Sequence, residues 1–484
     1  MPVQKYDNTD PFSIYEYSKG LIGHSLYDLL GNNVIEYFKK GKGGLGQMVE
    51  ELYFGYKINT DEHPDFEEAG LELKCTPLLK YKSTDEWRIK ERLVCTMIDY
   101  NKIITESFED SHFLQKCKLM LLLFYLHVYH EKSYNFKFFF RVLWQLPEKD
   151  LLIMKHDYEV IINKIKTGKA HLLSEGDTVY LAACRKGQKG EKPQKQPYSE
   201  TLAPRRAFSL KPAYMRTILK EVVSTKQDHL TNVSFNKNQN TEIVSIESLR
   251  KASLEDIILN RFKPFYGKDY IEICNILHIN ESTAKQKYSI AANSIISKNI
   301  KNIDDSEEFQ KSGIRLKTVR VSETGMPEES MSFKNIDYIA VANTNEWINS
   351  EVYELFTSRF LFVVFKEVKN QTININKRET KNNSIKTVKE NRYILDKVFF
   401  WTMPIKNLSI AYEYWQNIKS NVDNNHIELK YFWSIKMKKL FHVRPKGIKT
   451  SYKQAAENPN GGKADKYCYW FNADYVKSII ELQK

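Results

Sequence analysis

Short apolar runs and segments of helical periodicity follow one another along the chain and predict a mixed α/β protein. The most apolar run, LMLLLFYLHVY (119–129), is too short to span a bilayer and predicts a buried strand. The segment AGLELKCTPL (69–78) alternates, so its leucines face one side of a predicted strand while Glu72 and Lys74 share the other side. The segment SIESLRKASLEDIILNRF (245–262) has the pattern of a helix.

Similar segments recur in the same order in the two halves of the chain. This ordered recurrence predicts a duplicated domain, with two mixed α/β copies in one polypeptide. The pairs are GLIGHSLYDLLG with YGKDYIEICNILHI, AGLELKCTPL with SGIRLKTVRV, LMLLLFYLHVYHEK with RFLFVVFKEVKN, YLAACRKGQK with FHVRPKGIK, and AFSLKPAYMRTIL with CYWFNADYVKSII.

A polar segment separates the two halves. STKQDHLTNVSFNKNQNTE (224–242) is rich in Asn, Gln, Ser and Thr and lacks periodicity, which indicates a linker or loop. A chain of 484 residues is also too long for one compact core. We therefore expect a first domain over residues 1–223, a linker and helix over 224–255, and a second domain over 256–484.

The excess of basic residues favours binding of a polyanionic partner. Lys and Arg number 73 against 60 acids, which gives a net charge of +13 and favours nucleic acid first and an anionic membrane second. The N-terminal segment has no signal-peptide core. The cysteines form no C-x-x-C pair, so they predict neither a zinc site nor a disulfide framework and fit a reduced, cytoplasmic setting. They are Cys75, Cys95, Cys117, Cys184, Cys274 and Cys468.

Asp65, Glu72 and Lys74 are candidates for phosphodiester chemistry. Mg²⁺ takes oxygen ligands, usually one or two carboxylates, and leaves positions for water and phosphate oxygens. Asp65 and Glu72 would supply those carboxylates, and Lys74 would face the attacking water or the phosphate. The alternative is a surface ion pair, because DNNHIELK (423–430) reproduces the same acid and acid-x-lysine pattern by chance.

The second copy serves as an internal control for this motif. Arg315 stands where the first copy has Glu72, Lys317 matches Lys74, and Glu308 is the acid at the spacing of Asp65. An arginine at the central ligand position would repel a divalent cation. We therefore expect the second copy to keep the fold and lose the chemistry.

A glycine turn precedes the motif and leads into a predicted helix, GQMVEELYFGY (46–56). Gly41, Gly43 and Gly46 also satisfy G-x-G-x-x-G, but no clear strand precedes them, so a dinucleotide site is disfavoured. The helix carries two acids, Glu50 and Glu51, toward the later ones. Either acid could be a further metal ligand or a base, and either could be a solvent-facing residue.

The segments KGGLGQMVEELYFG, PDFEEAGLELKCTP and YLAACRKG resemble the signatures of the GATC-specific endonuclease family. That family includes the mismatch-repair nicking enzyme MutH and larger type II restriction enzymes. The length, the segments KERLVCTMIDY and PYSETLAPRRAFSLKPAYM, and the second copy with HVRPK resemble the two-domain restriction enzymes. The resemblance implies two tandem MutH-like restriction-endonuclease domains of mixed α/β (α+β) fold, a pseudo-dimer in one chain, of which only the first is catalytic.

The resemblance also implies roles for individual residues. It puts the metal-binding acids at Asp65 and Glu72 and the catalytic lysine at Lys74, with Mg²⁺ as the cofactor. An upstream acid of the family falls on Glu50 when counted from the glycine turn and on Glu51 when counted back from YFG. A second family lysine falls on Lys116 or Lys118, and the sequence leaves both pairs of alternatives open.

Two basic segments, one in each copy, are candidates for DNA binding. Residues 185–220 contain ten Lys or Arg and two acids, and residues 436–453 contain seven and none. Lysines on phosphates give salt-dependent affinity, whereas arginine or lysine can read guanine in the major groove. Arg185, Lys186, Arg444 and Lys446 resemble the family's base-reading loop. Arg205 and Arg206 are weaker candidates, which would contact phosphate or serve a structural role.

These observations predict a Mg²⁺-dependent type II restriction endonuclease that cuts both strands of double-stranded DNA at GATC. Family precedent places the cut 5′ of the G. One active centre in a chain requires a transient homodimer on DNA or two successive nicks. The second copy would bind another DNA site. A cognate methyltransferase is expected in the same system without direct contact. The alternatives are a MutH-like repair nickase and a DNA-binding regulator without catalysis.

Overall fold

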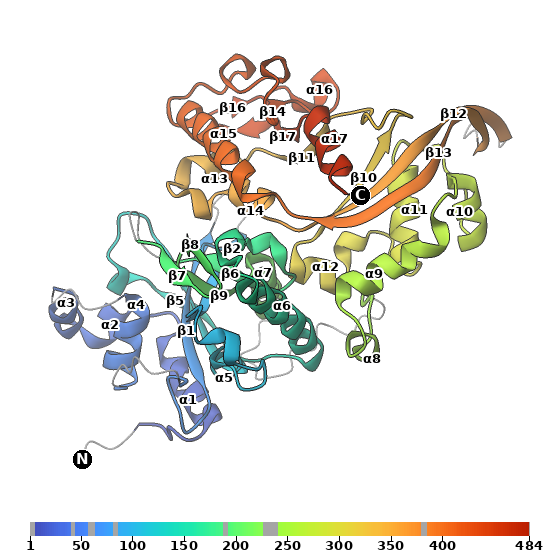
Figure 1. Cartoon of the computed structure of the whole chain (residues 1–484). Coiled ribbons are helices and arrows are strands. Elements are labelled where there is room, and N and C mark those ends of the chain that lie inside the picture. Colours follow the sequence, from blue (N-terminus) through green and yellow to red (C-terminus); the bar gives the residue numbers. More distant parts are fainter. Residues whose placement is uncertain are drawn as a thin grey trace. The chain divides into compact units, whose positions relative to one another are not determined.

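The computed structural model describes residues 5–39, 44–56, 63–80, 86–186, 192–225, 241–378 and 385–483. The chain forms two compact units, shown in sequence colours in Figure 1. The first unit contains residues up to 240 together with 244–253 and 310–313. The second contains 241–243, 254–309 and 314–484. Much of the predicted linker, residues 226–240, lies outside the described residues.

The first sheet of the first unit has the order β2-β1-β4-β5. Strand β4 (Leu119–Leu126) is the predicted apolar strand, and its central position between β1 and β5 buries most of its side chains. Strand β1 (Glu72–Lys80) runs parallel to β4, and β2 (Trp87–Ile89) and β5 (Phe138–Gln145) are antiparallel to their neighbours. This arrangement places the start of β1 beside the start of β4.

The second sheet of the first unit is antiparallel and has the order β3-β9-β6. Its strands are β3 (Leu93–Met97), β9 (Arg206–Leu210) and β6 (Leu181–Arg185). A short hairpin is also present, made of β7 (Gln194–Gln196) and β8 (Ser199–Ala203). The helices of this unit are α1 (Pro11–Tyr17), α2 (Leu26–Leu30), α3 (Asn32–Lys39), α4 (Leu45–Met48), α5 (His112–Cys117), α6 (Glu148–Lys166), α7 (Pro212–Thr225) and α8 (Ile246–Leu249).

The second unit repeats this topology. Its first sheet has the order β10-β12-β13, with β10 parallel to β12 and β12 antiparallel to β13. Its second sheet has the order β11-β17-β14, as β3-β9-β6 has in the first unit. The strands are β10 (Arg315–Val321), β11 (Met331–Asn335), β12 (Phe360–Arg378), β13 (Ile385–Trp401), β14 (Phe441–Arg444), β15 (Ala456–Glu457), β16 (Lys463–Ala464) and β17 (Cys468–Phe471).

The helices of the second half follow the same plan. A long helix follows each first sheet, α6 in the first unit and α15 in the second, and a C-terminal helix follows each second sheet. Helices α2 and α10 both begin with a capping box, in which Ser25 and Asp269 bond the backbone three residues on. The helices are α9 (Leu254–Phe262), α10 (Tyr270–Leu277), α11 (Lys287–Ile296), α12 (Glu307–Ser312), α13 (Tyr338–Asn343), α14 (Glu351–Phe356), α15 (Ile405–Asp423), α16 (Lys449–Tyr452) and α17 (Ala473–Glu481).

Each unit has its own hydrophobic core. In the first unit, leucines of β1 and β4 pack with aromatic residues of the N-terminal helices. In the second, phenylalanines of β12 pack with rings from β13, α15 and β17. The prediction of a mixed α/β chain built from two copies of one topology is confirmed. The predicted helix over 245–262 is two helices, α8 and α9, separated at Arg250–Ser253.

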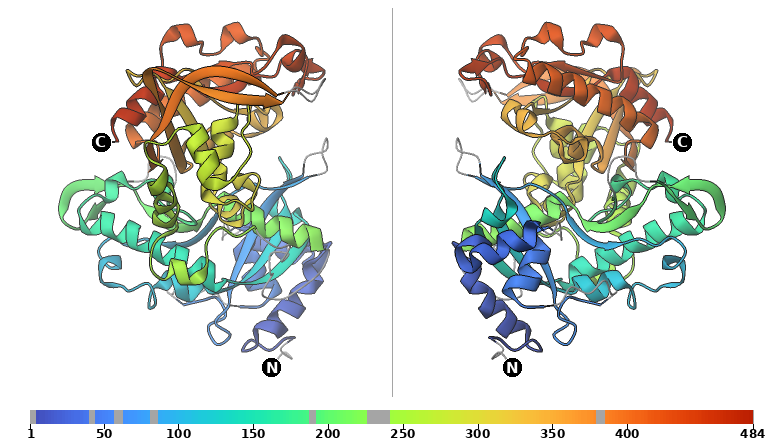
Figure 2. Two further views of the ribbon diagram at one scale, coloured as in Figure 1. Left: turned by 90° about the vertical axis from the view of Figure 1, so that its right-hand side faces the viewer. Right: turned by 90° about the vertical axis from the view of Figure 1, so that its left-hand side faces the viewer.

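Figure 2 shows two further views, in which β12 and β13 run on together as a long antiparallel pair. Across the described ranges, no helix is long and apolar enough to cross a membrane. The predicted buried strand over 119–129 is longer than β4, which ends at Leu126, and Val128 and Tyr129 beyond it are exposed.

Candidate active site

A tight turn brings Asp65 back over the beginning of β1. Phe66 and Leu71 exchange two backbone hydrogen bonds of 2.9 and 3.1 Å, and Gly70 turns the chain with a φ of +60°. The Asp65 carboxylate accepts a hydrogen bond of 2.8 Å from the backbone N–H of Leu73. In return, the N–H of Asp65 donates to Oε2 of Glu72 at 3.2 Å. The two acids of the motif are therefore held together by backbone geometry.

Glu72 and Lys74 share one face of β1, as the alternation predicts. Lys74 Nζ donates to Oε1 of Glu72, and the two form an ion pair. The Glu72 side chain is only 1% exposed, whereas 22% of the Lys74 side chain reaches solvent. A surface ion pair would leave both groups in water, so the buried carboxylate is unlike the surface alternative.

The motif DNNHIELK shows what that surface alternative looks like. Lys430 and Glu428 form an ion pair of 2.7 Å, with 63% and 68% of their side chains exposed. Asp423 pairs instead with Lys419 on α15. The same residue pattern therefore gives a dispersed, solvated arrangement at this second place.

The structure separates Lys116 from Lys118. Lys116 lies in the last turn of α5, and its Nζ is 3.7 Å from Oε2 of Glu72. Lys118 is the residue after α5 and lines a pocket together with His63 and Gln145. Of the two lysines, Lys116 is therefore the one that contacts Glu72.

The structure also separates Glu50 from Glu51, which lie on a π-helical turn (Val49–Tyr53) after α4. Burial, with repulsion from the Asp65 and Glu72 carboxylates, raises the pKa of Glu50 to about 7. Glu51 bonds Tyr37 instead, and burial together with this carboxylate raises the pKa of Tyr37 to about 12. Glu50 therefore faces the cluster. Gly41 and Gly43 of the glycine turn lie outside the described residues.

Burial and charge act in opposite directions on the paired groups. Burial raises the pKa of the Glu72 carboxyl, and the Lys74 and Lys116 ammonium groups oppose that effect. Burial favours a neutral Lys74, but the Glu72 and Asp65 carboxylates outweigh it and raise the pKa of Lys74. Lys74 is thus held as a cation beside a buried carboxylate.

The donor chemistry of this cluster suits a hard divalent cation. Asp65 and Glu72 supply carboxylate oxygens at one point of the sheet, and Mg²⁺ needs only one or two such ligands. The Asp65 and Glu72 carboxylates repel Glu50, and a bound cation would offset this negative charge. Among the described residues, no three His, Cys, Asp or Glu side chains are gathered closely enough to form a metal site by themselves.

The DNA-binding candidates of the first unit fall into two groups. Arg185 and Lys186 are exposed at the end of β6, and Arg205 is exposed just before β9. Arg206 is buried, and its guanidinium donates to the carbonyl oxygens of Ala183 and Leu173. Of the two roles considered for Arg206, the structural one is supported, because both terminal nitrogens of its guanidinium donate inside the unit, and the prediction of a DNA contact there is corrected.

Arg444 and Lys446 stand at the equivalent end of β14 in the second unit. The Arg444 guanidinium lies 4.0 Å from the centre of the Trp470 ring, and Trp470 Nε1 donates to the Arg444 carbonyl at 3.0 Å. Lys446 is exposed beyond it. The stacking fixes the direction of Arg444 at the strand end.

The start of β10 in the second unit, which corresponds to the start of β1 with Glu72 and Lys74, has a different arrangement of charges. Lys317 donates to the carbonyl of Ser332 at 2.9 Å. Burial and the nearby Arg315 and Lys446 lower the pKa of Lys317 to about 7, opposed by Asp304. The acid near Lys317 is therefore Asp304, in the segment NIDDSEEF.

Glu308, the acid matched by spacing, points elsewhere. It is buried and accepts from the N–H of Ile243 at 3.1 Å. Glu308 therefore does not occupy the position in the second unit that Asp65 occupies in the first, and this match was wrong. Asp304 was missed because the spacing was counted along the chain, although NIDDSEEF contains the earlier acids that could have signalled it.

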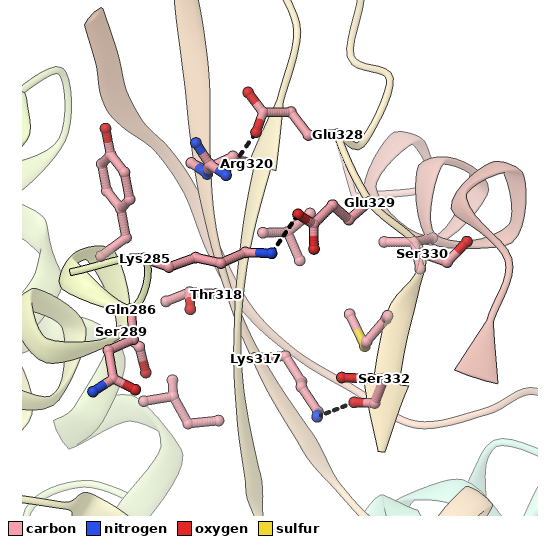
Figure 3. Close-up of a pocket in the computed structure, with 15 residues that line it drawn as sticks. Lys285, Gln286, Ser289, Lys317, Thr318, Arg320, Glu328, Glu329, Ser330 and Ser332 are labelled. Carbon is pink, nitrogen blue, oxygen red and sulfur yellow. Dashed lines mark hydrogen bonds and ion pairs between the residues drawn. The ribbon is translucent and has the colours of Figure 1, made fainter. Parts of the chain in front are cut away.

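A cavity of about 310 Å³ opens beside Lys317, between β10, β11 and the start of α11 (Figure 3). Four of its charged side chains form two ion pairs, Lys285 with Glu329 and Arg320 with Glu328, each at 2.7 Å. In the described lining, both of these carboxylates are thus bound to a cation, whereas in the first unit Asp65 and Glu72 also accept hydrogen bonds from backbone N–H groups. That the second copy lacks the metal-binding acids stays a prediction.

Comparison with known proteins agrees with the geometry. Residues 54–157 match the family described as DNA mismatch repair enzyme MutH. That range contains Asp65, Glu72, Lys74 and Lys116. The chain is also 36% identical over 370 residues to the type II restriction enzyme Sau3AI of Staphylococcus aureus, a match that covers 73% of this chain and 72% of that protein.

Proposed function

This chain belongs to the MutH-related family of type II restriction endonucleases, and we propose that it cleaves both strands of double-stranded DNA at 5′-GATC-3′ with Mg²⁺. The observation that carries the proposal is the buried Glu72 carboxylate, which touches Lys74 and lies 3.7 Å from Lys116. Family precedent places the cut 5′ of the G. A cytoplasmic location fits an enzyme of this function.

Asp65 and Glu72 would hold the metal, with Glu50 as a further carboxylate close by. When bound, Mg²⁺ supplies an activated water and offsets charge on the phosphate. The hydrogen bond from the backbone N–H of Leu73 to the Asp65 carboxylate orients that carboxylate before substrate arrives. Lys74 and Lys116 place positive charge where negative charge develops on the phosphate.

The second unit is proposed to bind DNA without cutting it. It keeps the topology of the first unit but has Arg315 in place of Glu72. Binding two DNA sites with one chain would raise apparent affinity. A single active centre then requires a transient homodimer on DNA or two successive nicks. A cognate methyltransferase is expected in the same system without direct contact.

The test compares wild type with two matched carboxylate variants on a plasmid that carries several GATC sites. Glu72→Gln removes the charge of the buried acid, and Glu428→Gln removes the charge of the exposed acid in DNNHIELK. Wild type and Glu428→Gln are expected to give a GATC fragment ladder with Mg²⁺ and none with EDTA. Glu72→Gln is expected to leave the plasmid intact.

Three other outcomes would contradict parts of the proposal. Cleavage by Glu72→Gln would show that the proposed acid is not required. A nicked circle as the final product would favour the repair nickase. A plasmid that is retarded in a gel but never cut by wild type would favour the DNA-binding regulator.

A further inference from the structure

The second unit has a β-ribbon that the first unit lacks. Strand β12 pairs with β10 only from Phe360 to Lys366, yet it continues with β13 as far as the pair Arg378 and Ile385. In the first unit, β4 and β5 have eight residues each. We call residues 367–378 and 385–393 the ribbon, which Figures 1 and 2 show as the extension of β12 and β13.

One face of the ribbon is held by α10 and α11. Ile375 is fully buried on this face. Glu390 forms an ion pair with Lys287 of α11, and Arg392 Nε donates to Asp269, the cap of α10, at 2.8 Å. A two-stranded hairpin alone is marginally stable in water. These contacts supply the support that the ribbon needs.

The opposite face is polar and exposed. Residues directly opposite each other in an antiparallel pair share a face. Thr372 pairs with Asn391, and Asn374 pairs with Lys389, so these four share a face that alternates with Ile373 and Ile375. All four side chains are exposed, as is Thr387. Across the described part of this face, every one of these side chains can donate or accept a hydrogen bond.

This composition fits the edges of base pairs. Asn can bond adenine through two atoms, Thr can bond any base, and Lys can bond guanine or a phosphate. The major groove admits a two-stranded β-ribbon. The sequence from Lys366 to Arg392 also contains eight Lys or Arg residues against three Glu, which suits a polyanion.

We propose that the exposed face of the ribbon enters the major groove of double-stranded DNA and extends the contact of the second unit along the duplex. The inference rests on the proposed DNA-cutting function. It adds a contact surface that the duplicated topology does not supply, because the first unit has no counterpart of the ribbon. Asn374 and Lys389 are the pair at its described centre.

The experiment uses the full-length protein in EDTA with a duplex of about 40 base pairs that carries one central GATC. Asn374→Ala/Lys389→Ala alters the exposed face. Lys406→Ala/Asn424→Ala, at the two ends of α15, removes the same residue types from exposed positions of the same unit. Affinity is measured by fluorescence anisotropy, and groove contact by protection of guanine N7 from dimethyl sulfate.

The ribbon variant is expected to bind about tenfold more weakly, because it loses the base contact of Asn374 and the base or phosphate contact of Lys389. It is also expected to lose protection of guanine N7 outside GATC, whereas the α15 variant keeps both. Thermal unfolding of the two variants should match wild type, since both pairs are exposed.

Equal affinity and equal protection for wild type and the ribbon variant would overturn the inference and leave the proposed function intact. A change in self-association measured by sedimentation, with no change in DNA binding, would also overturn it by assigning the ribbon to a second copy of this chain. Failure of wild type both to bind the duplex and to cut the plasmid would overturn the proposed function and this inference together.

Discussion

The side-chain nitrogen of Lys116, at the end of α5, lies 3.7 Å from Oε2 of Glu72, at the start of β1. Lys74 holds the other oxygen of the same carboxylate. Burial of a carboxylate is costly because the group loses water, and the two cations compensate part of that cost. Glu72, Lys74 and Lys116 together form the centre of the proposed active site.

Lys116→Ala is expected to slow cleavage about 10²- to 10³-fold, the usual cost of losing a placed electrostatic group. Lys118→Ala is the matched control, because it removes the same charge two residues further along, where Lys118 lines a pocket with Gln115 and Gln145. The measurement is the single-turnover rate on a short GATC duplex with saturating enzyme. Equal losses in both variants would instead indicate a general effect of positive charge near α5.

Glu50→Gln is expected to reduce the same single-turnover rate, whereas Glu51→Gln is expected to leave it within about twofold of wild type. The reason is orientation: Glu50 feels the charges of Asp65 and Glu72, and Glu51 bonds Tyr37. Glu51→Gln should instead lower the pKa of Tyr37, which ultraviolet titration can follow. A larger loss of rate from Glu51→Gln would reverse the assignment.

His442 is expected to make the second unit less stable in acid. Its ring is fully buried, and burial together with the nearby Arg444 lowers its pKa from 6.5 to about 4. Between these pH values His442 is protonated in the unfolded chain but neutral in the folded unit. The free energy of unfolding therefore falls as pH drops from about 6.5 to about 4. The loss is about 3 kcal/mol for a shift of this size.

The measurement is urea unfolding followed by tryptophan fluorescence at several pH values, since Trp470 stacks on His442. His442→Phe should flatten the dependence on pH in that interval. His426→Phe, which replaces an exposed histidine, should leave it as in wild type. An unchanged slope in His442→Phe would show that other groups cause the acid sensitivity.

Lys311 and Asp150 form a buried ion pair inside the first unit. Lys311 Nζ lies 2.7 Å from Oδ2 of Asp150, both side chains are 1% exposed, and Tyr214 donates to the same oxygen. Lys311→Met would leave the carboxylate without this cation, which costs about 3–5 kcal/mol of unfolding free energy. Urea unfolding measures the loss.

Two control variants test whether the loss of stability in Lys311→Met comes from the unpaired buried charge. Lys155→Met removes the partner of Glu109 in a largely exposed pair and should change stability by less than about 1 kcal/mol. Asp150→Asn/Lys311→Met should recover part of the loss, because no unpaired charge is then buried. A double variant as unstable as Lys311→Met would point to lost packing instead of lost charge.

Local patterns predicted much of the fold. The apolar run at 119–129 contains β4, and the paired segments contain strands or helices at equivalent places of the two units. The pairing of Glu72 with Lys74 also followed from alternation along one strand. These features depend on periodicity and on order along the chain, which the sequence contains directly.

The two open alternatives needed tertiary structure. Glu50 and Glu51 are neighbours, and the π-helical turn that carries them decides which one faces Asp65. Lys116 and Lys118 lie on either side of the end of α5, so the direction of the chain there decides which one reaches Glu72. A local pattern cannot supply that direction, because it depends on how α5 packs.

The duplicated topology, the family resemblance, and the motif of two acids and a lysine were predictable from the sequence. Three features required the folded chain: the internal bonds of Arg206, the position of Asp304 instead of Glu308 near Lys317, and the exposed polar face of β12 and β13. Each of these depends on which side chains lose water and which charges meet. The burial of a side chain and its charged neighbours depend on residues that are distant in the chain. Spacing along the sequence therefore does not predict them.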